Sequence, residues 1–200
     1  MLFSFLRDVP TESCETSKVS IFALQELIEE AWDNGVNDHG RIQTGGVRHT
    51  RKYVGTSEAQ ALFKNRGVNC AGTAFENTEG DLKAYEKLLD SIERYFHLGA
   101  NSLQVTSAPK VTTTALPPVF LQRPGHSMTI VGLLVRRDGS RELLVFDPAY
   151  APCKHMIDFT SAVDTFGYVP KLSKPYRRGK AYLEKFEAFE TLRLTDFAPP

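Results

Sequence analysis

Hydrophobic side chains recur at helical spacing in two long segments of the first half of the chain. Residues 20–34 carry apolar positions on one face, namely Ile21, Leu24, Leu27, Ile28, Ala31 and Trp32. Residues 81–98 repeat this pattern with Leu82, Tyr85, Leu88, Leu89, Ile92, Tyr95 and Phe96. Ser20 stands at an N-cap position, and Gly35 and Gly99 stand where the two helices should end. The pattern predicts two amphipathic helices.

A shorter helix is predicted between them. The stretch TSEAQALFKNRG, residues 56–67, places Ser57 and Gln60 at the spacing of a capping box and finishes on Gly67. The following stretch VNCAGTAF, residues 68–75, is short and apolar, which predicts a buried strand. Helices therefore dominate the first half.

The second half has the character of a sheet. Three segments rich in β-branched, aromatic and other apolar residues follow one another, namely PPVFLQ, HSMTIVGLLV and RELLVFD. Pro-Gly and Asp-Gly breaks separate them, and the second break is a strong hairpin signal. A closing strand is predicted near Thr191 to Leu194. Helices first and strands later, without an internal repeat, predict an α+β fold, which we take as one domain over residues 1–200.

The balanced charge narrows the classes of partner. Lys plus Arg number 24 and Asp plus Glu number 24, so no net field draws the chain to nucleic acid or anionic lipid. The hydrophobic fraction of 42% is that of a globular protein, and no apolar run approaches the ~20 residues of a membrane helix. The opening MLFSFLRDVP has no basic leader or small-residue cleavage site, so we expect no secretion.

The cysteines indicate neither disulfides nor a metal site. Cys14, Cys70 and Cys153 are scattered and odd in number, with no Cys-x-x-Cys pair and no histidine at zinc-finger spacing. We therefore expect no metal and no cofactor. Reduced thiols fit a cytoplasmic or nuclear protein.

His126 and Asp147 are the first candidates for chemistry. A two-residue turn at the Asp-Gly break would pair Asp147 with Ile130. Because alternate residues share a face of a strand, His126 and Asp147 would point to the same side of the sheet. Four residues of offset still amount to ~13 Å, so contact between the two requires an irregularity in the RRDGSR loop.

A carboxylate that reaches the imidazole can fix the tautomer of His126 and stabilise its charged form, as in triads of nucleophile, base and acid. Gln122, four residues earlier, adds an amide donor that can face a developing oxyanion. A packing histidine and a turn-forming Asp before Pro explain the same residue types. From these residues alone both interpretations stay open.

The amino-acid sequences of four segments resemble those of a known protein family. In chain order ELIEEAWDNG, TRKYVGTSEAQAL, LPPVFLQRPGHSMTIVGLL and LLVFDP resemble the papain-like cysteine peptidases of ubiquitin and the ubiquitin-fold modifier. The likeness is greatest to the zinc-finger-containing branch, whose pattern is roughly L-Q-H-Q-G-H-S-R-T followed by L-x-L-D-P, and it runs from Met1 to about Leu194. It implies a papain-like fold with His126 as general base, Asp147 as its orienting acid and Gln122 as an oxyanion-hole contributor.

The resemblance also implies a substrate. Members directed at the ubiquitin-fold modifier draw their histidine from a D-P-H motif, whereas this chain reads Asp147-Pro148-Ala149. Ubiquitin is therefore the favoured modifier, although Arg123 and Pro124 depart from the H-Q of the ubiquitin-directed branch.

The family's nucleophile lies in a W-G-C-G-Y-R-N segment that continues into something like MLFSFL, the text with which this chain opens. We therefore expect that the nucleophilic cysteine is missing from these 200 residues and that the chain as given is inactive. Since the helix of that segment packs against the sheet in the family, an apolar groove is expected beside Gln122 and His126. Cys14, Cys70 and Cys153 lack the helix N-terminal setting that lowers a thiol pKa.

The remaining polar residues have simpler explanations. Glu58 stands in the first turn of a helix, where an acid interacts with the helix dipole. The other histidines are expected at surface or capping positions, and they are His39, His49, His97 and His155. A basic stretch with interleaved aromatics is typical of a solvated surface rather than a nucleic-acid site, and it comprises Lys171, Lys174, Tyr176, Arg177, Arg178, Lys180 and Tyr182.

Three functions are consistent with these observations. The leading hypothesis is the C-terminal part of a thiol peptidase that hydrolyses conjugates of ubiquitin, or of a ubiquitin-like modifier, after the modifier's C-terminal glycine. The alternative is a catalytically dead binding protein, a pseudoenzyme or truncated isoform that keeps the modifier groove. The third is an α+β domain whose resemblance is only ancestral. The expected partner in the first two is the modifier, with no nucleic acid and no membrane.

Overall fold

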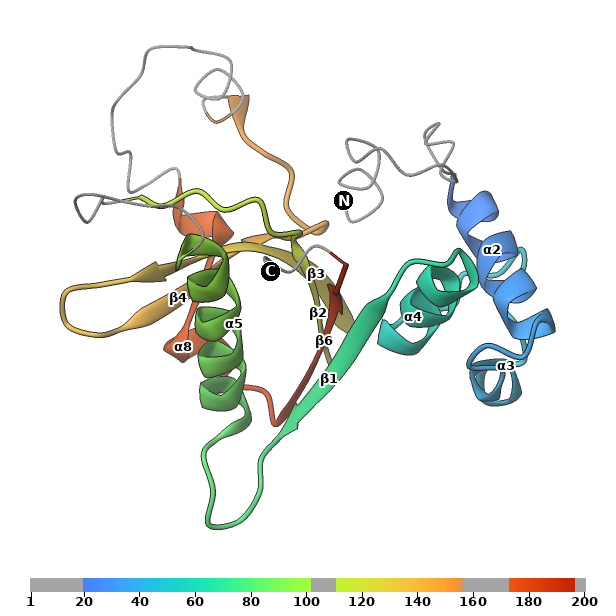
Figure 1. Cartoon of the computed structure of the whole chain (residues 1–200), viewed down its shortest axis with the longest axis horizontal. Coiled ribbons are helices and arrows are strands. Elements are labelled where there is room, and N and C mark those ends of the chain that lie inside the picture. Colours follow the sequence, from blue (N-terminus) through green and yellow to red (C-terminus); the bar gives the residue numbers. More distant parts are fainter. Residues whose placement is uncertain (1–19, 102–110, 155, 157–172, 197–200) are drawn as a thin grey trace.

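Antiparallel strands organise the molecule into a sheet (Figure 1). The computed structural model describes residues 20–101, 111–154, 156 and 173–196. The strands among these residues are β1 Cys70–Glu76, β2 Val119–Arg123, β3 His126–Val135, β4 Arg141–Phe146, β5 Arg177–Gly179 and β6 Ala188–Leu194. Their order across the sheet is β1-β6-β2-β3-β4-β5, so the last strand of the chain lies between β1 and β2.

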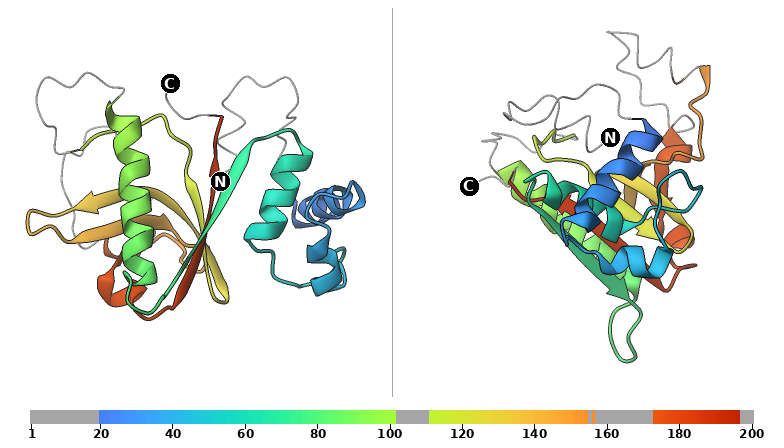
Figure 2. Two further views of the ribbon diagram at one scale, coloured as in Figure 1. Left: turned by 60° about the horizontal axis from the view of Figure 1, so that its bottom comes forward. Right: turned by 90° about the vertical axis from the view of Figure 1, so that its right-hand side faces the viewer.

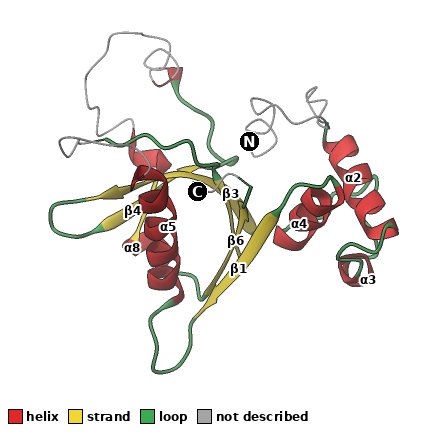
Figure 3. Cartoon of the chain, viewed as in Figure 1, coloured by secondary structure: helices red, strands yellow, loops and turns green. Residues whose placement is uncertain are grey.

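Most helices precede most strands in the sequence, and the two kinds of element are segregated in space as in an α+β fold (Figure 3). They are α2 Ile21–Asp33, α3 His39–Thr44, α4 Thr56–Asn65, α5 Ala84–Asn101 and the short α8 Lys180–Leu183, with a 3-10 turn η1 at Lys174–Tyr176. In the part of the chain that the structure describes, no helix is both long and apolar enough to cross a membrane.

Alternation along the strands builds two cores on opposite faces of the sheet. Leu121 of β2 joins a core with α5 residues such as Leu88, whereas its neighbour Phe120 packs against a second core that includes Trp32 of α2 and Leu62 of α4. Figure 2 shows α5 lying across the sheet, whereas α4 lies beside β1 with α2 and α3 beyond it. The β2–β3 hairpin therefore lies between two helical layers.

The two long helices are confirmed, with corrections at their ends. The Ser20 hydroxyl accepts a hydrogen bond from the Ala23 N–H at 3.1 Å, as an N-cap should. Ile21, assigned to the apolar face, is 74% exposed because it lies in the first turn of α2. The helix predicted to end at Gly99 runs on as α5 to Asn101.

The short helix and the first strand differ more from the prediction. Helix α4 begins at Thr56, and the Glu58 carboxylate accepts the Gly55 N–H at 2.8 Å, so the predicted capping by Ser57 and Gln60 is wrong. The strand over VNCAGTAF exists as β1 but is not buried, since it is an edge strand in which only Phe75 is fully buried. The short α3 had no periodic signal.

Candidate active site

His126 begins β3 at the closed end of the β2–β3 hairpin. Arg123, the last residue of β2, pairs with His126, so the chain reverses over Pro124 and Gly125 alone. Gly125 has a φ of 71°, in the left-handed region that favours glycine, which explains the Pro-Gly pair at this turn. This tight turn fixes the backbone position of the histidine.

The β3–β4 hairpin brings Asp147 closer to His126 than a two-residue turn allows. Val135 pairs with Arg141, whereas a two-residue turn would have paired it with Glu142. The loop is therefore longer than two residues, which is the irregularity predicted for RRDGSR. It moves the register by one residue.

A bulge within β3 moves the register again, and the sequence did not predict it. The pairing skips Val131, so that Ile130 pairs one residue earlier on β4 than a regular ladder would allow. The two shifts together bring Asp147 across from Met128, only two residues or ~7 Å along the strand from His126. The pair that a regular hairpin would separate is thus brought within reach.

The His126 ring and the Asp147 carboxylate are in contact. His126 Nε2 lies 2.7 Å from Asp147 Oδ1, and the two side chains are 20% and 11% exposed. Because an ionised carboxylate only accepts hydrogen bonds, the neutral ring carries its proton on Nε2 and keeps a lone pair on Nδ1. The predicted contact is confirmed, and Nδ1 is the ring nitrogen that can take a proton.

Other groups hold Asp147 in its charged form. Oδ1 also accepts the Ala149 N–H at 2.9 Å, and Oδ2 accepts Nη2 of Arg178 at 2.7 Å. Burial alone would raise the pKa of Asp147, but the hydrogen bonds from Ala149, Arg178 and His126 outweigh burial and hold that pKa below its usual value. The carboxylate is therefore an ionised, oriented partner for the ring.

Gln122 is oriented by the first turn of α4. Its Oε1 accepts the Thr56 N–H at 2.7 Å and the Thr56 hydroxyl at 3.2 Å. With two donors on the oxygen, the amide nitrogen is the end of the side chain that can donate to a substrate. Gly55 lies so close that an added Cβ would stand 2.8 Å from Gln122 Oε1. A side chain at position 55 would therefore displace the Gln122 amide.

The structure brings Gln122 and His126 to the same end of the hairpin but not into contact. Gln122 pairs with Ser127, next to the pair of Arg123 and His126, so alternation directs the two side chains to opposite faces. Within the described residues no hydrogen bond joins them. A reacting group that meets both must lie at the end of the hairpin.

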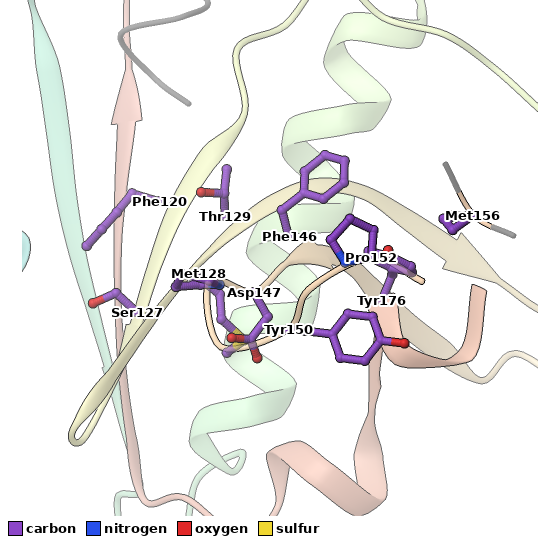
Figure 4. A pocket seen from close by; sticks show the side chains of 11 residues that line it. Phe120, Ser127, Met128, Thr129, Phe146, Asp147, Tyr150, Pro152, Met156 and Tyr176 are labelled. Carbon is purple, nitrogen blue, oxygen red and sulfur yellow. The ribbon is translucent and has the colours of Figure 1, made fainter. Parts of the chain in front are cut away.

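An apolar cavity of about 600 Å³ opens beside Asp147 (Figure 4). Phe120, Thr129 and Phe146 form one cross-strand row of its wall, and Tyr150 lines it from the loop after β4. Ser127 and Met128, neighbours of His126, also line it. The lining includes neither His126 nor Gln122, so the groove expected beside these two residues lies instead beside Asp147, the partner of His126.

Neither cysteine within the described residues makes a hydrogen bond to His126. Cys70 lies on β1, where it pairs with Leu194 of β6, and both β6 and β2 separate β1 from β3. Burial raises the pKa of its thiol, which opposes thiolate formation. Cys153 is exposed in the loop after β4, and Cys14 lies outside the described residues.

Other predicted residues have structural surroundings. Glu58 caps α4 through the Gly55 N–H, in agreement with its structural assignment. His97 faces Glu93 at 3.6 Å on the exposed side of α5, and His155 lies outside the described residues. Among the residues that the structure describes, no cluster of His, Cys, Asp and Glu could hold a metal ion.

Arg178 and Thr56 are the site residues that sequence reasoning missed. Arg178 was assigned to a solvated basic loop, but it lies on β5 with a side chain that is 13% exposed and binds Asp147. That assignment is wrong because β5 joins the sheet edge next to β4. The role of Arg178 could not be predicted, because nothing in the sequence distinguishes it from the neighbouring basic residues. Thr56 could have been found from its place at the start of the predicted helix.

Comparison with known proteins identifies a family. The model of peptidase family C78 matches residues 1–192. Zinc finger-containing ubiquitin peptidase 1 of Rattus norvegicus is 33% identical over 134 residues, which cover 66% of this chain and 22% of the rat protein. The Macaca fascicularis protein of the same name is 30% identical over 159 residues, which cover 78% of this chain and 26% of that protein.

Two further matches are more distant. Ubiquitin carboxyl-terminal hydrolase mug105 of Schizosaccharomyces pombe is 28% identical over 128 residues, which cover 64% of this chain and 46% of that protein. A crystal structure of UfSP from C. elegans matches with a TM-score of 0.44 and 17% identity, covering 89% of this chain and 29% of that chain. The chain thus spans about a quarter of the mammalian relatives it matches.

Proposed function

The chain belongs to peptidase family C78, and from this membership and the site geometry we propose that it is the C-terminal part of a cysteine peptidase that hydrolyses ubiquitin conjugates. Cleavage follows the C-terminal glycine of the modifier. The observation that carries the proposal is the 2.7 Å contact between His126 Nε2 and Asp147 Oδ1, which leaves Nδ1 as a base. The names of the relatives support ubiquitin as the modifier.

The proposed reaction is acyl transfer to a cysteine thiol. His126 Nδ1 takes the thiol proton, and the thiolate attacks the carbonyl carbon of the modifier's last glycine. When the C–N bond breaks, the protonated ring gives its proton to the leaving amine. Water then attacks the thioester with His126 again as base, which releases the modifier's carboxylate and regenerates the thiol.

Asp147 and Gln122 have separate roles in this proposal. Asp147 keeps the His126 proton on Nε2 and stabilises the charged ring that forms after proton transfer. Gln122, whose oxygen is occupied by Thr56, presents its amide nitrogen to the oxyanion of the tetrahedral intermediate. The two residues act at different atoms, so their removal should have different effects.

We further propose that the chain is a single papain-like domain in the cytosol or nucleus. The nucleophilic cysteine would lie on a segment outside the described residues. The positions of Cys70 and Cys153 support an outside nucleophile. The apolar cavity beside Asp147 supports a helix packed there, because burying its aromatic wall would stabilise the fold.

A binding protein without peptidase activity is the second candidate. It is favoured by the same observation, that Cys70 lies on the far edge strand and that no hydrogen bond joins Cys153 to His126 within the described residues. In that case ubiquitin would bind, but no thioester would form.

The test uses the chain as given and an extended protein, in which the nucleophile segment precedes Met1, taken from upstream coding sequence or grafted from a family relative. Each is incubated with ubiquitin that carries a vinyl-type electrophile at its C-terminus, and mass spectrometry locates the modified cysteine. We expect an adduct on the added cysteine of the extended protein and none on the chain as given. Binding without an adduct in either form would favour the second candidate. Cleavage by the chain with Cys14, Cys70 and Cys153 replaced by Ser would exclude the cysteine mechanism.

A further inference from the structure

The Arg178 side chain makes more contacts than neutralising the Asp147 carboxylate requires. It lies on β5 opposite Leu143 of β4, and its side chain is 13% exposed. Nη2 donates to Asp147 Oδ2 at 2.7 Å, while Nη1 donates to the carbonyl oxygens of Pro175 at 2.7 Å and Arg177 at 3.1 Å. The guanidinium is thus anchored to its own backbone on one side and to the carboxylate on the other.

A second set of contacts fixes the plane of this guanidinium. Arg178 Cζ lies 4.9 Å from the centre of the Tyr182 ring, and Arg123 Nε donates to the Tyr182 hydroxyl at 2.9 Å. Arg123 is the cross-strand partner of His126. The contacts therefore form a closed ring from His126 through Asp147, Arg178, Tyr182 and Arg123 back to the hairpin.

Within the proposed peptidase function, we propose that Arg178 is a positioning residue that fixes the plane of the Asp147 carboxylate and thereby keeps the His126 proton on Nε2. His126 and the Ala149 N–H use one carboxylate oxygen, and Arg178 uses the other. Held at both oxygens, the carboxylate cannot rotate away from the ring. Tyr182 and Arg123 keep the guanidinium in register with it.

A purely structural ion pair is the competing explanation, and Arg141 shows what such a pair looks like. Arg141 donates to Asp90 and Glu93 of α5 at 2.6 and 2.7 Å and joins the sheet to the helix. Arg178 instead binds one carboxylate next to a titratable ring.

The test compares Arg178→Gln, Arg178→Lys and the control Arg141→Gln in the full chain as given, which requires no activity. Nitrogen-15 NMR reports the tautomer of the His126 ring, and carbon-13 NMR follows the titration of the Asp147 carboxyl. In Arg178→Gln we expect a substantial fraction of the ring to carry its proton on Nδ1. The pKa of Asp147 should rise, because a cation beside the carboxylate is removed.

The conservative variant and the control sharpen the result. Lys keeps the charge but not the fork, so Arg178→Lys should restore most of the Asp147 titration and only part of the tautomer preference. Arg141→Gln should change neither. If Arg178→Gln moves the Asp147 titration while the tautomer stays on Nε2, positioning is wrong and Arg178 acts only as a charge. If Arg178→Gln does not fold, an unchanged tautomer in both Arg178→Lys and Tyr182→Leu overturns the proposal equally.

Activity separates this proposal from the function it rests on. In the extended protein, Arg178→Gln should lower kcat by about 10- to 100-fold with little change in KM, as expected when a catalytic group is misplaced. A tautomer shift in an extended protein that never cleaves ubiquitin would contradict the peptidase function and leave the positioning intact. Full kcat together with a shifted tautomer would overturn the catalytic relevance of Arg178.

Discussion

Two buried carboxylates in this molecule use the same electrostatic arrangement to different ends. Glu29 accepts the Val47 and Arg48 N–H groups on Oε1 and the Arg41 guanidinium on Oε2. Asp147 likewise accepts one backbone N–H and one arginine. Both have a pKa below the usual value although burial opposes it. Backbone donors and a cation are therefore sufficient to keep a buried carboxylate ionised.

The difference lies in what the remaining capacity of each carboxylate does. Every contact of Glu29 joins α2 to the chain around α3, so it is saturated by structural groups. Asp147 differs because its Oδ1 also contacts the titratable ring of His126 and because the residue lines a cavity. Ionisation of a buried acid therefore does not by itself mark a functional site, and the role that we propose for Asp147 rests instead on its contact with a titratable ring.

The largest expected contrast is in turnover. Asp147→Asn in the extended protein should lower kcat by about 10³- to 10⁴-fold, because the amide can donate to the ring and favour the wrong tautomer. Glu29→Gln, the same change at the structural carboxylate, should leave kcat for ubiquitin-amide hydrolysis within a few-fold of the parent. Equal losses of kcat in the two variants would contradict the proposed difference between the two carboxylates.

For the free energy of unfolding, we expect the larger loss in Glu29→Gln and the smaller loss in Asp147→Asn. Glu29→Gln weakens several charge-assisted hydrogen bonds at a position that is 4% exposed, so the free energy of unfolding should fall by about 2 to 4 kcal/mol. Urea denaturation of the chain as given measures this directly. Asp147→Asn should cost less, since the site lies at the end of a strand. A larger loss in Asp147→Asn would mean that its contacts are mainly structural.

Both carboxylates should contribute to the pH dependence of stability. Each has a folded-state pKa below its unfolded value of about 4, so its contribution is present above pH ~5 and is lost as the pH falls through the folded-state pKa. Unfolding free energies measured from pH 6 to pH 2 should therefore decline less steeply in Glu29→Gln and in Asp147→Asn. Parallel curves for parent and variants would contradict the lowered pKa values.

The smallest predicted effect concerns the orientation of Gln122. Gly55→Ala would place a Cβ 2.8 Å from Gln122 Oε1 and displace the amide, so kcat in the extended protein should fall by about tenfold, less than for Gln122→Ala. Gly72→Ala is the control, because its nearest neighbour would be 3.5 Å away. A Gly55→Ala variant with full kcat and a Gln122→Ala variant without it would show that the amide tolerates displacement.

Periodicity and alternation predicted the longer elements but neither the short α3 and β5 nor the strand registers. The helical spacing of residues 20–34 and 81–98 predicted α2 and α5, and the apolar runs of the second half predicted β2, β3 and β4. The end of α5 was missed because tertiary packing carries a helix through a glycine that the local rule treats as a stop. Burial of β1 was misjudged because no local pattern tells an edge strand from a central one.

The site shows the same division between local and tertiary information. Alternation placed His126 and Asp147 on one face, and the family resemblance supplied their roles. The contact itself depends on the skipped Val131 and on a longer hairpin loop, which arise from the packing of the sheet and not from a sequence motif. Arg178 could not be predicted, since its partner lies 31 residues away on a strand that only the folded sheet brings near.

The measurement that tests the central claim most directly is ubiquitin-amide hydrolysis by the extended protein with His126→Ala, beside His97→Ala as a matched control on the exposed face of α5. We predict that His126→Ala abolishes turnover, because no other described histidine contacts Asp147, whereas His97→Ala keeps the parent rate. Circular dichroism and the thermal midpoint confirm that both variants are folded. Full turnover in folded His126→Ala would contradict the account and leave the histidine as a packing residue.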